Sequence, residues 1–92
     1  MEVIKVDDLN LKMENAEFGQ YLRSVRQAKK ISIRQLAKAV SKTPTYISDI
    51  EKGNNKPPER ELLDRIIAAL HLEEFPDIRN KLYDLAAKER KD

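Results

Sequence analysis

The sequence predicts an all-α protein of five helices, and three observations lead to that class. Apolar residues recur at helical spacing in five separate stretches, and no stretch alternates convincingly as a strand would. Gly53 and the four prolines stand where the predicted helices begin or end. At 92 residues the chain is long enough for one domain and not two. We expect that domain over residues 15–90, after an N-terminal tail of residues 1–14.

The first two helices are expected over residues 16–29 and 33–40. Asn15 and Ser32 are their candidate N-caps, because a short polar side chain accepts hydrogen bonds from the free N–H groups of a first turn. One apolar stripe marks each helix, which predicts that each buries a single face. The stripe residues are Phe18, Leu22 and Val25 in the first helix and Ile33, Leu36, Ala37 and Val40 in the second.

The third helix is expected over residues 43–52. Thr43 is its candidate cap, and Pro44 suits the first helical position, where the N–H that proline lacks has no partner in the helix. Gly53 is expected to end the helix by taking a left-handed conformation. The residues predicted to face inward are Ile47 and Ile50.

The fourth and fifth helices are expected over about residues 58–70 and 76–88. The clearest loop in the sequence, residues 53–58, separates the third helix from the fourth. Both helices again carry an apolar stripe. The stripe residues are Leu62, Leu63, Ile66, Ile67 and Leu70 in the fourth helix and Ile78, Leu82 and Leu85 in the fifth.

Positive charge is concentrated in one third of the chain, although the net charge is only +2. Residues 21–56 hold nine lysines and arginines but only two carboxylates, Asp49 and Glu51, so their net charge is +7. Residues 1–20 carry −3 and residues 57–92 carry −2. A basic segment of this kind is expected where a polyanion docks, and a solvated helix face is the alternative.

Several classes of protein are excluded by what the sequence lacks. There is no cysteine and only one histidine, His71, so we expect no disulfide, no metal site and no cofactor. No Ser/His/Asp grouping and no glycine-rich phosphate loop is present, so we do not expect an enzyme. No apolar run could span a membrane and no signal-peptide core follows Met1, which predicts a cytoplasmic protein.

The short connection between the second and third helices points to a function. Three residues, 41–43, join the two helices, which predicts a steep angle between them, as in a helix-turn-helix unit. The small side chain of Ala37 allows a close approach to Ile47 and Ile50. The outward face of the third helix is mostly small or polar, as a helix in the major groove of DNA requires. That face comprises Pro44, Thr45, Ser48, Asp49 and Lys52.

Together these features resemble the helix-turn-helix family of phage repressors and Cro proteins, also called XRE-type, whose domain is the five-helix lambda-repressor-like fold. The resemblance covers residues 23–70 by motif and most of the chain by helix order. The residues that carry it are Leu22, Arg23, Arg26, 33–37, Val40, Ser41, 46–53, Pro57, Pro58 and 68–70.

The resemblance implies a DNA-binding surface around the third helix. The first residues of that helix would read bases, and helix N-termini and the following loop would contact phosphates. The DNA-binding residues implied are Ser32, Arg34, Lys42, Thr43, Pro44, Thr45, Tyr46, Ser48, Asp49, Lys52, Asn54, Asn55 and Lys56. The family also implies a structural ion pair between Arg26 and Glu51.

Some of these positions depart from the family or allow two interpretations. Pro44 and Thr45 stand where several relatives carry glutamines that hold adenine. Asp49 stands where a basic or amide residue is usual, and it either accepts from cytosine or holds local structure by bonding Thr45 or Lys52. Tyr46 either contacts the sugar-phosphate backbone or packs on the turn.

The function expected is that of a sequence-specific transcriptional regulator, a repressor, which inserts residues 43–52 into the major groove of double-stranded DNA. Binding as a homodimer to two half-sites is the usual geometry of the motif. We expect the last helix, with the segment before it, to form the dimer surface through Phe75, Ile78, Leu82, Tyr83 and Leu85. The alternative is an antitoxin-like subunit that binds a protein partner through the last helix. No separate domain for a small molecule is expected.

Overall fold

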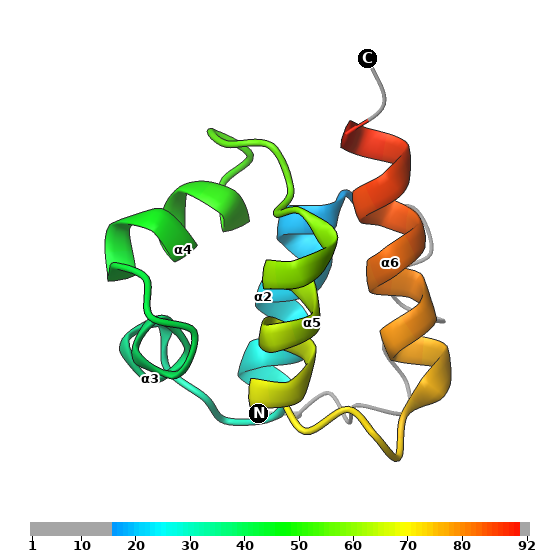
Figure 1. The fold of residues 1–92 in the computed structure, drawn as a ribbon, viewed down its shortest axis with the longest axis horizontal. Helices are drawn as coiled ribbons and strands as arrows, with labels where there is room; N and C mark the ends of the chain where they lie inside the picture. The colour runs from blue at the N-terminus through cyan, green and yellow to red at the C-terminus, as the bar shows by residue number, and fades with distance from the viewer. Residues whose placement is uncertain (1–15, 91–92) are drawn as a thin grey trace, which may run out of the picture.

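The computed structural model describes residues 16–90, in which the predicted all-α architecture of five helices is confirmed. The helices are α2 (Phe18–Ala28), α3 (Ile33–Ala39), α4 (Pro44–Glu51), α5 (Arg60–Ala69) and α6 (Pro76–Arg90). α2 and α5 lie at the centre, with α3 and α4 on one side and α6 on the other (Figure 1). None of these helices is both long and apolar enough to cross a membrane. The tail predicted for residues 1–14 lies outside the described residues.

The start of α2 differs from the prediction, which had placed the cap at Asn15. Asn15 lies outside the described residues, and Glu17 occupies the N-cap position instead. The N–H of Glu17 donates to Gln20 Oε1 (3.1 Å), and the N–H of Phe18 donates to Glu89 Oε2 at the end of α6 (2.6 Å). The start of α2 is thus held both by a local capping box between Glu17 and Gln20 and by a contact from the far end of the chain.

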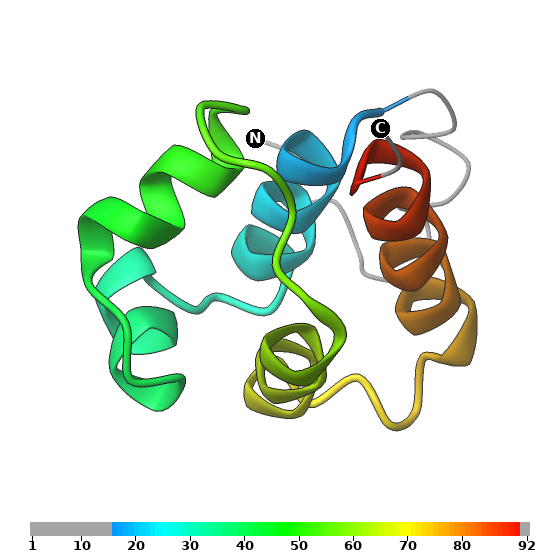
Figure 2. The ribbon, with the colours of Figure 1, turned by 45° about the horizontal axis from the view of Figure 1, so that its top comes forward.

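The start of α5 also comes later than expected, at Arg60 rather than near Pro58. Pro57 and Pro58 are buried in an irregular segment, and Arg90 Nη1 donates to the carbonyl of Pro57 (2.9 Å). Figure 2 shows this segment passing across α2 on its way from α4 to α5. The two prolines belong to a packed connection and not to the helix.

Each of the helices α2 to α5 is followed by a residue in the left-handed conformation. These residues are Lys30 (φ 59°), Ser41 (φ 59°), Gly53 (φ 80°) and His71 (φ 54°). After α3, for example, the N–H of Ser41 donates to the carbonyl of Lys38 (3.2 Å), and the N–H of Lys42 donates to that of Ala37 (2.9 Å). Bonds of this kind satisfy carbonyls that the helix end would leave without partners. Only the glycine takes the conformation without strain, which is why it alone was predicted as a left-handed residue at a helix end.

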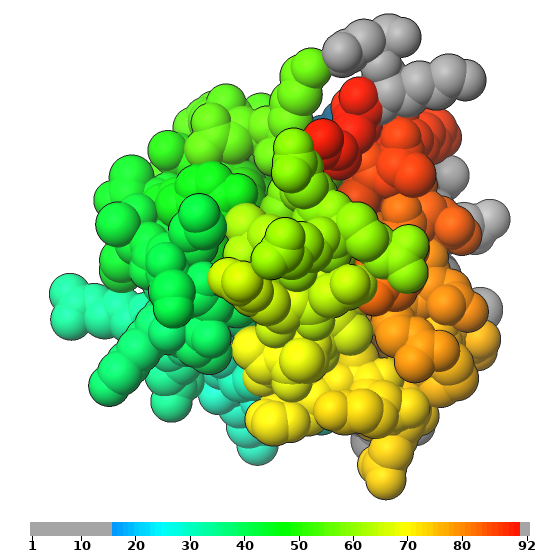
Figure 3. Space-filling model, viewed as in Figure 1, coloured from blue at the N-terminus to red at the C-terminus, as the bar shows by residue number. Residues whose placement is uncertain are grey.

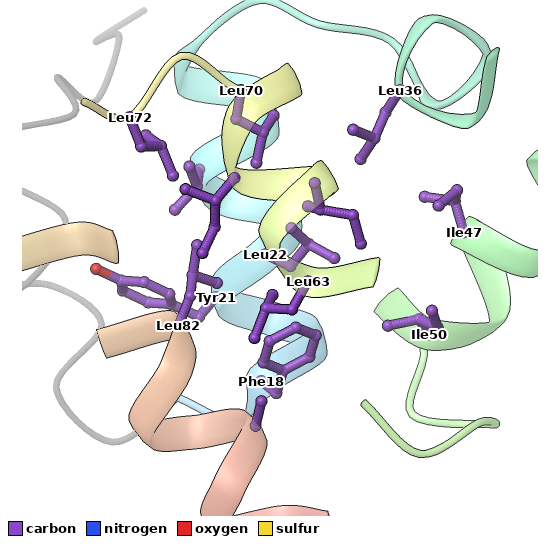
Figure 4. Packing of buried hydrophobic residues seen from close by; sticks show 14 of the residues in the cluster. Phe18, Tyr21, Leu22, Leu36, Ile47, Ile50, Leu63, Leu70, Leu72 and Leu82 are labelled. Atoms are coloured by element: carbon purple, nitrogen blue, oxygen red, sulfur yellow. The ribbon is translucent and has the colours of Figure 1, made fainter. Parts of the chain in front are cut away.

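One hydrophobic core joins all five helices (Figure 4). Most of the predicted stripe residues are buried in it, and so are Tyr21, Leu72 and Ala86, which the stripes did not include. Leu85 is only partly buried, because α6 faces the core along a line of residues spaced by four. That line consists of Ile78, Leu82 and Ala86.

Candidate nucleic-acid interface

α3 and α4 form a compact pair that crosses steeply, since Figure 1 views α3 nearly end-on and α4 from the side. Leu36 of α3 and Ile47 of α4 point toward each other (Figure 4), and both are fully buried. Each helix begins with its own cap: Ser32 Oγ accepts from the N–H of Gln35 (3.0 Å), and Thr43 Oγ1 accepts from the N–H of Tyr46 (3.1 Å). The arrangement is that of a helix-turn-helix unit.

A bidentate ion pair between Arg26 and Glu51 ties α2 to the last residue of α4. Arg26 Nε lies 2.7 Å from Glu51 Oε2, and Arg26 Nη2 lies 3.0 Å from Oε1. Arg26 Nη1 also donates to the carbonyl of Ile31 (2.9 Å). The side chains are only 8% and 3% exposed, respectively. A buried charge of either sign is tolerated only with such a partner, so the pair holds the end of α4 against α2.

Gly19 of α2 makes a second close contact at the same place, and it was not among the predicted residues. A Cβ atom at Gly19 would stand 2.4 Å from the carbonyl oxygen of Ile50 and 2.6 Å from that of Glu51. These are backbone atoms, so they cannot move aside as the end of a flexible side chain could. The available signal was a single glycine inside a helical pattern, which usually has a packing reason.

The outward side of α4 is open to solvent. Its first residues are exposed, Lys52 is exposed after its end, and Ser48 and Asp49 between them are partly buried. The backbone carbonyl of Asp49 accepts from the N–H groups of Asn54 (2.8 Å) and Asn55 (3.3 Å), which shapes the loop after the helix. The exposed members of the predicted DNA-binding set are Ser32, Arg34, Lys42, Thr43, Pro44, Thr45, Lys52, Asn54, Asn55 and Lys56.

Tyr46 lies between the solvent and the connection to α5. The ammonium of Lys42 stands 5.4 Å from the centre of its ring, and the same hollow is lined by Lys56, Pro57 and Leu62. Burial raises the pKa of the Tyr46 hydroxyl, with Arg90 opposing and Glu59 adding to that rise. The hydroxyl is therefore protonated at neutral pH, and it can donate a hydrogen bond to an anionic oxygen.

Beside the outward side of α4, the predicted DNA-binding residues lie at three places, two of which share Lys56. Lys42, Tyr46 and Lys56 meet in the hollow between α4 and α5. The loop of residues 52–56 lines a second hollow, together with the first residues of α2. Ser32 and Arg34 lie apart from both hollows, at the start of α3. The predicted surface thus combines the start of α3, the start of α4 and the loop of residues 52–56. In the sequence, the turn of residues 41–43 separates α3 from α4, and α4 separates that turn from the loop.

The predicted dimer surface cannot contact a second molecule with all of its residues, because two of them are buried in the core of their own chain. Ile78 is 3% exposed and Leu82 is fully buried, since both pack inside their own chain. Phe75, Tyr83 and Leu85 are partly buried at the edge of that core. We predicted that Ile78 and Leu82 contact a second copy of the chain, but α2 and α5 of the same chain cover them instead.

Contacts with charged neighbours occupy two of the remaining aromatic residues. The hydroxyl of Tyr83 donates to Asp64, and the guanidinium of Arg60 lies over its ring, 4.1 Å from the centre. The ammonium of Lys29 lies 5.1 Å from the centre of the Phe75 ring, and it donates to the backbone carbonyl of His71 (3.3 Å). These contacts join α2, α5 and α6 within one chain.

Comparison with known proteins agrees with this geometry. A family model described as a helix-turn-helix domain matches residues 17–75. The match includes α2, α3, α4 and α5 and ends just before α6. A search of curated proteins and a search of solved structures found no significant match.

Proposed function

The chain belongs to the XRE/Cro-like helix-turn-helix family, and from that premise we propose that it is a sequence-specific regulator of transcription. A helix-turn-helix domain implies binding to DNA. The sequence specificity of that binding and its effect on transcription are what we propose. The observation that carries it is the asymmetry of α4. Its inward residues Ile47, Ile50 and Glu51 are buried, whereas its first turn is exposed. In this proposal the first turn of α4 enters the major groove.

Base reading is assigned to the outward line of α4. Thr45 would contact the methyl group of a thymine or hydrogen-bond a base edge, and Asp49 would accept from the amino group of a cytosine. Ser48 lies between them on the same face. Phosphate contacts are assigned to residues around α4 that carry positive charge or hydrogen-bond donors. These are Ser32, Arg34, Lys42, Thr43, Lys52, Asn54, Asn55 and Lys56, and all of them are exposed.

Repression by a homodimer completes the proposal. Two copies would occupy half-sites about one helical turn apart and would thereby block access to the DNA between and around them. The residues of the predicted dimer surface that are still partly exposed are Phe75, Tyr83 and Leu85. Light scattering of the protein on selected DNA tests this part, and a single copy on every bound duplex would exclude the dimer.

The test of sequence-specific binding is selection of bound sequences from a random duplex pool at a stated salt concentration. Enrichment of a defined site supports the proposal, whereas equal affinity for every duplex contradicts it. Thr45→Ala is expected to change the preferred sequence. Lys56→Ala is expected to weaken binding to all sequences alike and to reduce the salt slope by about 1. Identical behaviour of the two variants would contradict the assigned surface.

A further inference from the structure

α6 lies outside the range that matches the family model, which ends at residue 75. It is a helix of 15 residues, and its middle covers α2 and α5 through Ile78, Leu82 and Ala86. Its last turn extends beyond this apolar contact and makes polar contacts with two other segments. Figure 3 shows the end of α6, in red, against the green segment that follows α4. The last turn of α6 is therefore the part of the helix that makes contacts beyond core packing.

The first polar contact is with the start of α2. Glu89 Oε2 accepts from the N–H of Phe18 (2.6 Å), one of the N–H groups that a helix start leaves without an intrahelical partner. A carboxylate is also favoured at this end of a helix by the helix dipole. The next residue is Gly19, which touches the backbone of Ile50 and Glu51. Glu89 thus holds α2 at the point where α2 meets the end of α4.

The second polar contact is with the loop that leads from α4 to α5. Arg90 Nη1 donates to the carbonyl of Pro57 (2.9 Å), and Arg90 Nη2 lies 3.7 Å from Glu59 Oε1. The Glu59 side chain is 82% exposed, so this ion pair contributes little. The hydrogen bond is the stronger contact, because Pro57 is buried and the bond to its carbonyl is itself partly buried.

The loop of residues 52–56 is therefore held at both ends. At its start, the carbonyl of Asp49 accepts from the N–H groups of Asn54 and Asn55. At its far end, Arg90 holds Pro57. The side chains between these two anchors are exposed and include Lys52 and Lys56. The first anchor belongs to α4 itself, and the second belongs to the helix outside the matched range.

We propose that Arg90 is a positioning residue for DNA binding: the last turn of α6 holds the loop of residues 52–56 in the conformation that meets the DNA backbone. This inference rests on the proposed function. A loop that is already ordered loses less conformational entropy when it binds, so its contacts contribute more to affinity. Loss of the anchor is expected to weaken binding by about three- to tenfold.

The test compares Arg90→Ala with Lys88→Ala, which removes the same charge from an exposed position on the last turns of α6. Binding to a duplex selected by the wild-type protein is measured over a series of salt concentrations. Amide hydrogen exchange at Asn54 and Asn55 is measured in the protein without DNA. Arg90→Ala is expected to raise Kd three- to tenfold, to reduce the salt slope and to speed exchange at both amides. Lys88→Ala is expected to match the wild type, and Arg90→Lys to restore part of the affinity.

Two results would overturn this inference while leaving the proposed function intact. In the first, Arg90→Ala and Lys88→Ala bind the selected duplex equally well. In the second, Arg90→Ala binds more weakly but keeps the wild-type salt slope and the wild-type exchange at Asn54 and Asn55, which indicates a loss of global stability only. A wild-type protein that binds no duplex would instead overturn the proposed function, and the inference with it.

Discussion

The two ends of α4 are held in opposite ways, although the helix is only eight residues long. At its C-terminal end, Glu51 is buried against Arg26, and Gly19 of α2 touches the backbone of the last turn. At its N-terminal end, the first residues are exposed, and the cap is a hydrogen bond to Thr43 within the same turn. One end of the helix is fixed in the protein interior, and the other is the end to which the proposed function assigns base recognition.

This difference has a physical consequence for substitutions. A change at the C-terminal end leaves a buried charge without a partner or forces two backbones apart, and either effect is expensive in folding free energy. A change at the N-terminal end alters groups that water can solvate. The first three predictions below test whether the two ends of α4 differ in this way, and the fourth concerns the turn that leads into the helix.

The largest loss of folding stability is expected for Glu51→Ala, at the buried C-terminal end of α4. The variant leaves the Arg26 guanidinium buried without its carboxylate, which destabilises proteins by about 3–5 kcal/mol. Urea unfolding measures the loss. The matched control is Glu61→Ala, which removes an exposed ion pair with Arg65 and is expected to change the free energy of unfolding by less than about 1 kcal/mol. Equal losses in the two variants would contradict the burial argument.

Gly19→Ala also tests the C-terminal end of α4, because the contact and the helix propensity predict opposite changes in the free energy of unfolding. Alanine is the better helix former by about 1 kcal/mol, so propensity alone would make the variant more stable. The added Cβ would meet the carbonyl oxygens of Ile50 and Glu51, and we expect a loss of about 1–3 kcal/mol instead. Thermal and urea unfolding measure it, with exposed Gln27→Ala on the same helix as the control. A stabilised Gly19→Ala protein would mean that α2 and α4 are not in close contact.

Thr43→Ala tests the exposed end. It removes the hydrogen bond from the N–H of Tyr46 to Thr43 Oγ1, and the expected loss is about 1 kcal/mol, as for other N-caps. Thr43→Ser keeps the hydroxyl and is expected to stay within about 0.5 kcal/mol of the wild type. A loss from Thr43→Ala as large as that from Glu51→Ala would remove the distinction between the two ends.

The smallest change in the free energy of unfolding, and the one increase in stability, is expected at the turn between α3 and α4. Ser41 has a φ of 59°, a conformation that costs a side-chain-bearing residue about 1–2 kcal/mol. Ser41→Gly is expected to stabilise the protein by about 0.5 kcal/mol, because the greater freedom of glycine in the unfolded chain offsets part of the relief. Gly53→Ala, at a φ of 80°, is expected to shift the urea midpoint in the opposite direction. Shifts of the same sign would contradict the strain argument.

Local interactions explain what could be predicted from the sequence. Ser32, Thr43 and Gly53 were identified as helix boundaries because a cap acts on residues three or four positions away. The inward residues of α3 and α4 followed from helical spacing, and the exposed side of α4 followed by exclusion. The ion pair of Arg26 with Glu51 came from the family resemblance, since neither residue reveals its partner by local spacing.

Long-range contacts explain what could not be predicted. Glu89, which is 71 positions away, accepts from the N–H of Phe18 at the start of α2. The late start of α5 accompanies a bond from Arg90, which is 33 positions from Pro57. The need for glycine at position 19 depends on the backbone of α4. None of these partners stands near its target in the sequence, so no local pattern records them.

The amino-acid pattern was enough to show that the chain is helical, where α3 and α4 begin, where α4 ends, and that the two form a helix-turn-helix unit. The packing of the helices was needed to show that the stripe of Ile78 and Leu82 is core, and that α4 is buried at one end and exposed at the other. The physical reason is the same in both cases. Periodicity shows that one face of a helix is buried, but it does not show which element covers that face.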